Sequence, residues 1–122
     1  MQTSELYRRG IVLPLDDQAE RSLRANDIDL STKVHFLEIP DGFFDSLRRH
    51  GLFDEINLRC GALLDDYEEE IIEASSLDGV LAAVDEMVGK TEEREPELEF
   101  LTQFHALIRK AISTSRPLLF EF

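Results

Sequence analysis

The sequence of 122 residues contains little cysteine, which forms cross-links, and little glycine and proline, which interrupt helices and strands. It contains one cysteine, Cys60, which excludes both an internal disulfide and a cysteine-based zinc site within one chain. The six glycines and four prolines lie mainly at the borders of predicted helices and strands. No internal repeat or low-complexity linker separates two halves. Residues 1–122 are therefore predicted to form a single small domain.

The short motifs of nucleotide-binding and hydrolytic proteins are also absent. The sequence contains no GK[ST], GxGxxG, GxSxG, HExxH or EF-hand pattern. No apolar run approaches the roughly 20 residues of a membrane helix, and the stretch 11–15 is too short for the apolar part of a signal peptide. We therefore expect a cytoplasmic protein with no cofactor, no metal site and no catalytic residue.

Basic residues are few, and they are scarcest in one region of the chain. The chain has 13 Lys and Arg against 26 Asp and Glu, which gives a net charge of −13. Residues 61–99 hold 14 of the acids against only Lys90 and Arg94. The negative electrostatic field of such an acidic region repels the phosphates of nucleic acids and anionic membranes, and it attracts basic proteins. The predicted partner is a basic protein, with no nucleic acid and no membrane.

The spacing of apolar residues predicts strands that alternate with helices, and therefore an α/β or α+β fold with one sheet of three to five strands and about five helices. The segment 33–39 is apolar on both faces, which predicts a central position or a sheet covered on both sides. The strands are expected at 11–13, 33–39 and 117–122, and the helices at 17–25, 41–51, 52–60, 77–88 and from Thr91 or Pro96 to about 112. The segment 65–73 can be a strand or a helix: its glutamates favour a helix, but it lacks a helical stripe of apolar residues, so a strand at 67–73 is preferred.

The acidic run that begins at Asp65 is the candidate binding site. It can be a docking surface for a basic partner, a weak cation site, or a solvated edge strand whose charges prevent aggregation. Because neighbouring strand residues point to opposite faces, a cation site needs acids from other elements. The candidate partner-binding residues are Asp65, Asp66, Tyr67, Glu68, Glu69, Glu70, Asp85 and Glu86, with help from the acids of 92–99.

The histidines and the cysteine are interpreted mainly as structural residues. His35 lies inside an apolar strand and is predicted to be half-buried in the core, whereas His50 is predicted to cap a helix. His105 borders a buried stripe and can act as a general base with an acid such as Glu99. Cys60 shares the apolar face of its helix and is predicted to be buried and unreactive.

Three hypotheses about function follow from these patterns. The first is a non-catalytic acidic module that binds a basic protein. Its size and acidity are similar to those of toxin-immunity proteins and other small acidic inhibitors, which implies an inhibitory role. The second is a small enzyme or ligand-binding domain with a pocket around His105 or His35. The third is a structural homodimer or larger homo-oligomer in which Phe43 or Phe44 and the last strand form the interface.

Overall fold

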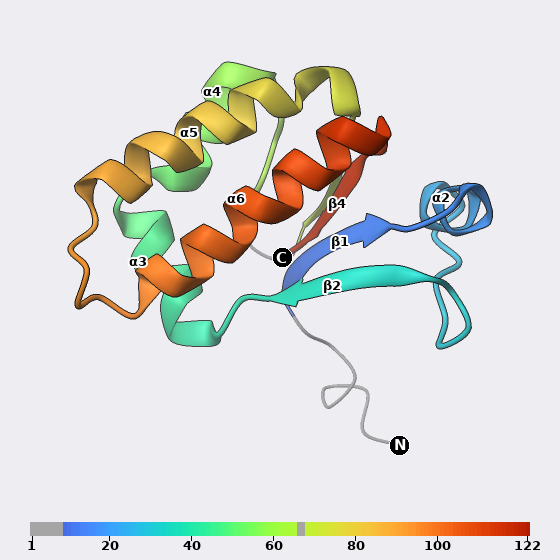
Figure 1. Cartoon of the computed structure of the whole chain (residues 1–122), viewed down its shortest axis with the longest axis horizontal. Coiled ribbons are helices and arrows are strands. Elements are labelled where there is room, and N and C mark those ends of the chain that lie inside the picture. The colour runs from blue at the N-terminus through green and yellow to red at the C-terminus, as the bar shows by residue number, and fades with distance from the viewer. Residues whose placement is uncertain (1–8, 66–67) are drawn as a thin grey trace.

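A computed structural model describes residues 9–65 and 68–122, which contain a four-stranded antiparallel sheet (Figure 1). The strand order is β2-β1-β4-β3, so the first and last strands of the chain are the two central ones. The sheet and its five helices confirm the predicted mixed α/β class. The strands are β1 (Gly10–Pro14), β2 (Val34–Glu38), β3 (Glu69–Ile72) and β4 (Leu118–Glu121).

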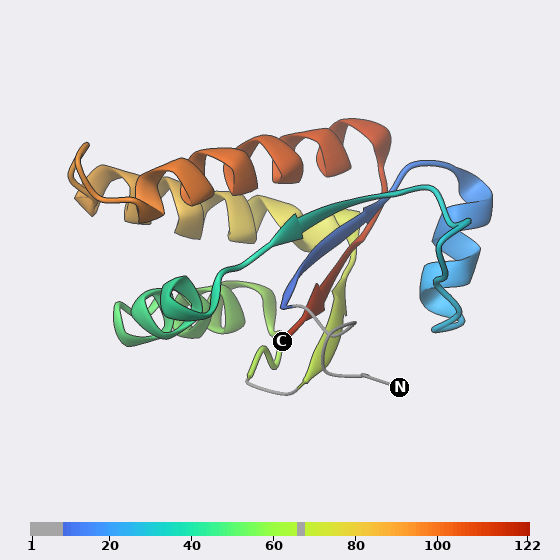
Figure 2. The ribbon, with the colours of Figure 1, turned by 90° about the horizontal axis from the view of Figure 1, so that it is seen from below.

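Helices cover the two faces of the sheet unequally. Four helices lie on one face, and a single short helix packs over one end of the other face (Figure 2). None of the helices in the described segments is long and apolar enough to cross a membrane. The helices are α2 (Asp17–Arg24), α3 (Asp41–Arg49), α4 (Leu52–Cys60), α5 (Leu77–Lys90) and α6 (Glu97–Thr114), with a 3₁₀ turn at Ala74–Ser76.

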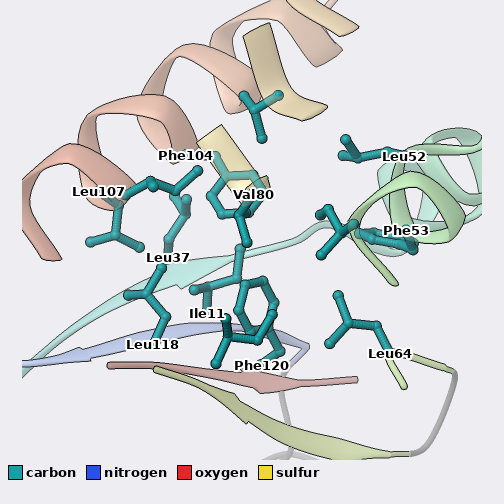
Figure 3. Close-up of a cluster of buried hydrophobic side chains, with 14 of the residues drawn as sticks. Ile11, Leu37, Leu52, Phe53, Leu64, Val80, Phe104, Leu107, Leu118 and Phe120 are labelled. Carbon is teal, nitrogen blue, oxygen red and sulfur yellow. The ribbon is translucent and has the colours of Figure 1, made fainter. Parts of the chain in front are cut away.

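The main hydrophobic core lies between the sheet and helices α3 to α6 (Figure 3). Ile11 of β1 and Phe120 of β4 are directly opposite each other and are both fully buried there. The ring of Phe120 contacts those of Phe104 on α6 and Phe122, with centroid distances of 6.1 and 5.9 Å. The alternation of Leu118, Phe120 and Phe122 toward this core confirms the predicted terminal strand.

A second, smaller cluster lies on the opposite face of the sheet. Val12 and Leu119 pair across β1 and β4 and pack with Leu23 of α2. The two central strands are therefore buried on both faces, which explains why their sequences are almost wholly apolar. Asp16 caps α2, because its carboxylate accepts a hydrogen bond from the backbone N–H of Ala19 at 2.7 Å.

Of the two alternatives predicted for 33–39, the central position is wrong, because β2 is an edge strand, and coverage on both faces is correct. Its apolar pattern arises because both faces are covered: Leu37 packs against the main core, and Phe36 packs against the second cluster. His35 is exposed, which contradicts the prediction of a half-buried residue. An edge strand can therefore be as apolar as a central one wherever helices or loops cover its two faces.

The start of the last helix also differs from one of the two predicted positions. The hydroxyl of Thr91 donates a hydrogen bond to the carbonyl of Met87 at 2.6 Å, so Thr91 closes α5 instead of opening α6. Helix α6 begins directly after Pro96, which was the alternative start. The acids at 92–95 consequently lie in the connection between the two helices.

Candidate acidic docking surface

The acidic residues singled out in the sequence do not form one continuous surface. Glu68, Glu69 and Glu70 lie at and beside the start of β3, whereas Asp85 and Glu86 lie on α5. Helix α5 leads away from the sheet and carries Asp85 about 12 Å along its axis (Figures 1 and 2). The remaining candidates in the run are Asp65, which is exposed, and Asp66 and Tyr67, which lie outside the described residues.

Asp85 and Glu86 each have a cationic or ionisable partner on a neighbouring helix. Nε2 of His105 on α6 lies 2.7 Å from Oδ1 of Asp85. Nη2 of Arg59 on α4 lies 2.9 Å from Oε2 of Glu86. The pairing predicted for His105 was with Glu99, but the packing of α5 against α6 brings Asp85 to it instead. These two acids therefore connect helices and have less free charge to offer a partner.

A different group of carboxylates occupies the margin of the sheet, and we call these residues the sheet-edge acids: Glu68, Glu69, Glu70 and Glu121. Glu69 is directly opposite Glu121 on β4, and Glu70 is opposite Phe120. Since Phe120 faces the main core, Glu70 lies on the helix-covered face, and Glu69 and Glu121 lie on the other face. Acidic side chains therefore border both faces of this edge.

No cation balances Glu68, Glu69 or Glu70 in the part of the chain that the structure describes. Four arginines of the described residues pair with other acids: Arg24 with Glu20 and Glu73, Arg59 with Glu55 and Glu86, Arg94 with Glu92, and Arg116 with Asp17 and Glu20. Arg48 lies 3.8 Å from Asp65 at the start of the run. The negative charge at β3 is therefore available to a partner.

Crowding of carboxylates at this margin changes the titration of Glu121. Its side chain is half-buried, and this burial is the main cause that raises the pKa of its carboxyl group above the ordinary value near 4.5. The negative charge of Glu69 and a hydrogen bond between the two carboxyl groups raise the pKa further. The folded protein therefore holds Glu121 in a place where its ionised form is disfavoured.

We expect the variant Glu121→Gln to be more stable than the wild type at about pH 7 and equally stable at about pH 3.5. A carboxyl group whose pKa is raised by folding contributes stability fully only below its ordinary pKa near 4.5. That contribution is lost as the pH rises through the raised pKa. The amide does not titrate, so it avoids the loss. Urea unfolding at both pH values measures the difference.

The matched control for this prediction is Asp45→Asn, at an exposed acid on α3 that is far from Glu69 in the sheet. The control is expected to follow the wild type closely at both pH values. A Glu121→Gln variant that is less stable than the wild type at about pH 7 contradicts the account of crowded carboxylates.

The loop that leads from α4 to the acidic run is anchored by Asn57. Its Nδ2 donates a hydrogen bond to the carbonyl of Leu64 at 3.0 Å, and the N–H of Leu64 donates to its Oδ1 at 2.7 Å. The side chain of Leu64 is itself buried in the main core. Both Asn57 and Glu121 were missed by the sequence analysis, because local spacing does not show which distant backbone or carboxylate a polar side chain meets.

A second acidic region lies in the connection between α5 and α6. Glu92 and Glu93 are exposed in it, and Glu99 is exposed in the first turn of α6. Among the described residues, Glu92 is the one of these three with an arginine partner, Arg94, at 2.9 Å. Figures 1 and 2 both place this connection at the far end of the two helices from β3. It is therefore a separate surface from the sheet-edge acids.

His50 and Cys60 both have structural contacts. Nδ1 of His50 lies 2.7 Å from the carbonyl oxygen of Ser46 at the end of α3, as predicted for a cap. Cys60 is half-buried, its Sγ donates to the carbonyl of Ser76 at 3.3 Å, and burial raises the pKa of its thiol. Within residues 9–65 and 68–122, no group of three or more His, Cys, Asp or Glu is arranged to hold a metal ion.

Comparison with known proteins gives one informative similarity. No family model and no curated protein matches the sequence. Among solved structures, the fold is similar to that of the Neisseria DNA mimic protein DMP12. The TM-score is 0.56 and the sequence identity is 15%, over 93% of this chain and 99% of the other. The similarity therefore concerns the fold along almost the whole of both chains.

The prediction of a basic protein partner with no nucleic acid is contradicted in its second part by this similarity, which points to mimicry of nucleic acid. That prediction rested on the repulsion between the carboxylates of an acidic protein and the phosphates of nucleic acid. It overlooked that an acidic protein can instead resemble DNA, and the similar structure belongs to a protein described as a DNA mimic.

Proposed function

We propose that the protein binds, without catalysis, to the basic surface with which a DNA-binding protein contacts DNA. The observation that carries the proposal is the fold shared with a DNA mimic protein over 93% of this chain. The net charge of −13 and the unbalanced sheet-edge acids support it. A surface of lysines and arginines built to meet phosphates can also meet carboxylates, since both contacts are ion pairs with oxygen acceptors.

The proposed docking surface keeps the acidic run Asp65, Asp66, Tyr67, Glu68, Glu69 and Glu70, and it adds Glu121. Glu68 and Glu70 lie on one side of the edge about 7 Å apart, and Glu69 lies on the other side opposite Glu121. The contribution of Asp85 and Glu86 is expected to be small, since both are paired with side chains of the protein itself.

The comparison favours a DNA-binding protein over a toxin as the partner, so the narrower hypothesis of a toxin-immunity protein receives no support. With either partner, the proposed binding relies on electrostatic steering of the acidic protein toward a basic surface. A partner that binds DNA is met inside the cell, and the proposal therefore retains the cytoplasmic location inferred from the sequence.

Competition for immobilised DNA tests the proposal directly. A column of double-stranded DNA is loaded with an extract of the source cells at about 50 mM salt, where phosphate contacts are strong. It is then washed with the purified protein. We expect the wash to release particular DNA-binding proteins, which mass spectrometry identifies. Reconstitution with one released protein then measures how its binding to a labelled duplex falls as the acidic protein is added.

An unrelated acidic protein of the same net charge serves as the control for this wash. If that control releases the same proteins at the same concentration, the effect is one of net charge alone and the proposal is wrong. Release of no protein by either wash also contradicts it.

A further inference from the structure

We propose that an extended lysine- or arginine-rich segment of the partner adds to the outer edge of β3 as a fifth strand. This inference rests on the proposed function, because it specifies how the acidic margin of the sheet recognises its basic partner. Addition of a strand to a sheet edge is a known mode of peptide recognition, in which main-chain hydrogen bonds supply affinity and side chains supply specificity.

The backbone of β3 is paired on one side only within the described residues. β3 pairs with β4, and the N–H of Phe122 donates to the carbonyl of Glu68 at 3.0 Å. Antiparallel pairs alternate between hydrogen-bonded and non-hydrogen-bonded positions. Glu70 and Ile72 therefore also bond to β4, and the N–H and C=O groups of Glu69 and Ile71 point to the outer side. Figure 2 shows β3 at the margin of the sheet.

The side chains at this edge select the charge of an incoming strand. Glu69 and Glu70 point to opposite faces of the sheet, so a strand placed beside them meets a carboxylate on either face. Cross-strand pairs of opposite charge are stabilising, whereas like charges directly opposite are destabilising. The edge therefore repels a second copy of itself and favours a basic strand.

The rest of the molecule supports this choice of edge. Ile71 is half-buried and packs in the cluster formed with Leu119, so it offers an apolar contact beside Glu69 on the same face of the sheet. The opposite edge strand, β2, follows Lys33 and carries His35. A basic segment finds less complementary charge there than at β3.

Amide exchange with a defined peptide tests strand addition. The probe is a blocked heptapeptide of alternating lysine and valine, and the control peptide has proline in place of every valine. The two peptides have the same charge, but proline cannot donate to a strand ladder. We expect only the lysine–valine peptide to slow exchange of the Glu69 and Ile71 amides in the full-length protein, as followed by NMR. Equal effects of both peptides, or no protection at either amide, overturns strand addition.

A pair of variants at Ile71 provides a second test. Ile71→Pro removes an outward N–H without removing a bond to β4, because this N–H does not belong to the ladder. Ile71→Ala retains the N–H and loses a similar part of the side chain. We expect the proline variant to bind the lysine–valine peptide about tenfold more weakly than the alanine variant, as for one lost hydrogen bond in the interface. Equal affinities contradict the proposal.

The outcomes also separate this inference from the proposed function. If the protein releases DNA-binding proteins from immobilised DNA but neither peptide protects the β3 amides, strand addition is wrong and the proposed function stands. If the peptide adds to β3 but no protein is released from DNA, strand addition stands as a property of the edge and the proposed function fails. Circular dichroism of Ile71→Pro verifies its folding, and the exchange experiment on the wild type decides the question if that variant is unfolded.

Discussion

Replacement of Phe120 by alanine is expected to lower the free energy of unfolding by about 3–5 kcal/mol. The ring is fully buried in a central strand and contacts the rings of Phe104 and Phe122. Its removal loses the transfer free energy of a large apolar group and leaves a cavity that the surrounding helices fill only in part. Because domains of this size are stable by only about 5–15 kcal/mol, the variant should unfold at much lower urea concentrations.

The control for this measurement is Leu58→Ala on α4, whose side chain is 80% exposed. That change is expected to alter the free energy of unfolding by about 0.5 kcal/mol or less. Both values come from urea titrations followed by far-ultraviolet circular dichroism, which is suited to a chain without tryptophan. A loss below about 1 kcal/mol for Phe120→Ala contradicts the central position of β4.

The elements of the fold were largely predictable because each has a local pattern. The alternation of Leu118, Phe120 and Phe122 predicted β4, and the stripe from Leu77 to Val88 predicted α5. The segment that contains β3 was left open between strand and helix, because its glutamates favour a helix although it has no helical stripe; the preferred extended form is the one present at Glu69–Ile72. Local periodicity reports on which faces of an element are covered, and this information is present in the sequence itself.

The arrangement of these elements was less predictable because it depends on pairing between distant segments. The sequence of β2 predicted either a central position or coverage of both faces, because a strand with both faces covered has the same apolar pattern at the edge of a sheet as at its centre. Nothing in the local sequence shows that Asp85 meets His105 or that Glu121 lies opposite Glu69. The acidic run was found from composition, but its division into paired and unpaired carboxylates required the structure.

Charge reversal at the sheet edge should abolish competition with DNA. The triple variant Glu68→Lys, Glu69→Lys and Glu70→Lys places three cations at the margin where the proposed partner presents its own. We expect its release of DNA-binding proteins from immobilised DNA to require at least tenfold more protein than the wild type, because steering and contact are both lost. The difference should shrink as salt rises, since the Debye length is only about 10 Å at 0.1 M ionic strength.

The matched control is the triple variant Glu92→Lys, Glu93→Lys and Glu99→Lys, which changes the net charge equally at exposed positions around the α5–α6 connection. It is expected to compete nearly as well as the wild type, since this region lies far from β3 (Figure 1). If both triple variants lose competition equally, only net charge matters and the sheet edge is not the docking surface.

Folding and docking should respond in opposite directions to the change at Glu69 alone. In the folded protein the carboxylate of Glu69 is one of the causes that raise the pKa of Glu121, and a lysine at this position replaces repulsion with attraction. Glu69→Lys is therefore expected to shift the urea midpoint upward at about pH 7 while it weakens competition with DNA. Stabilisation together with loss of competition distinguishes a carboxylate retained for binding from one that supports the fold. A lower urea midpoint contradicts this interpretation of Glu69.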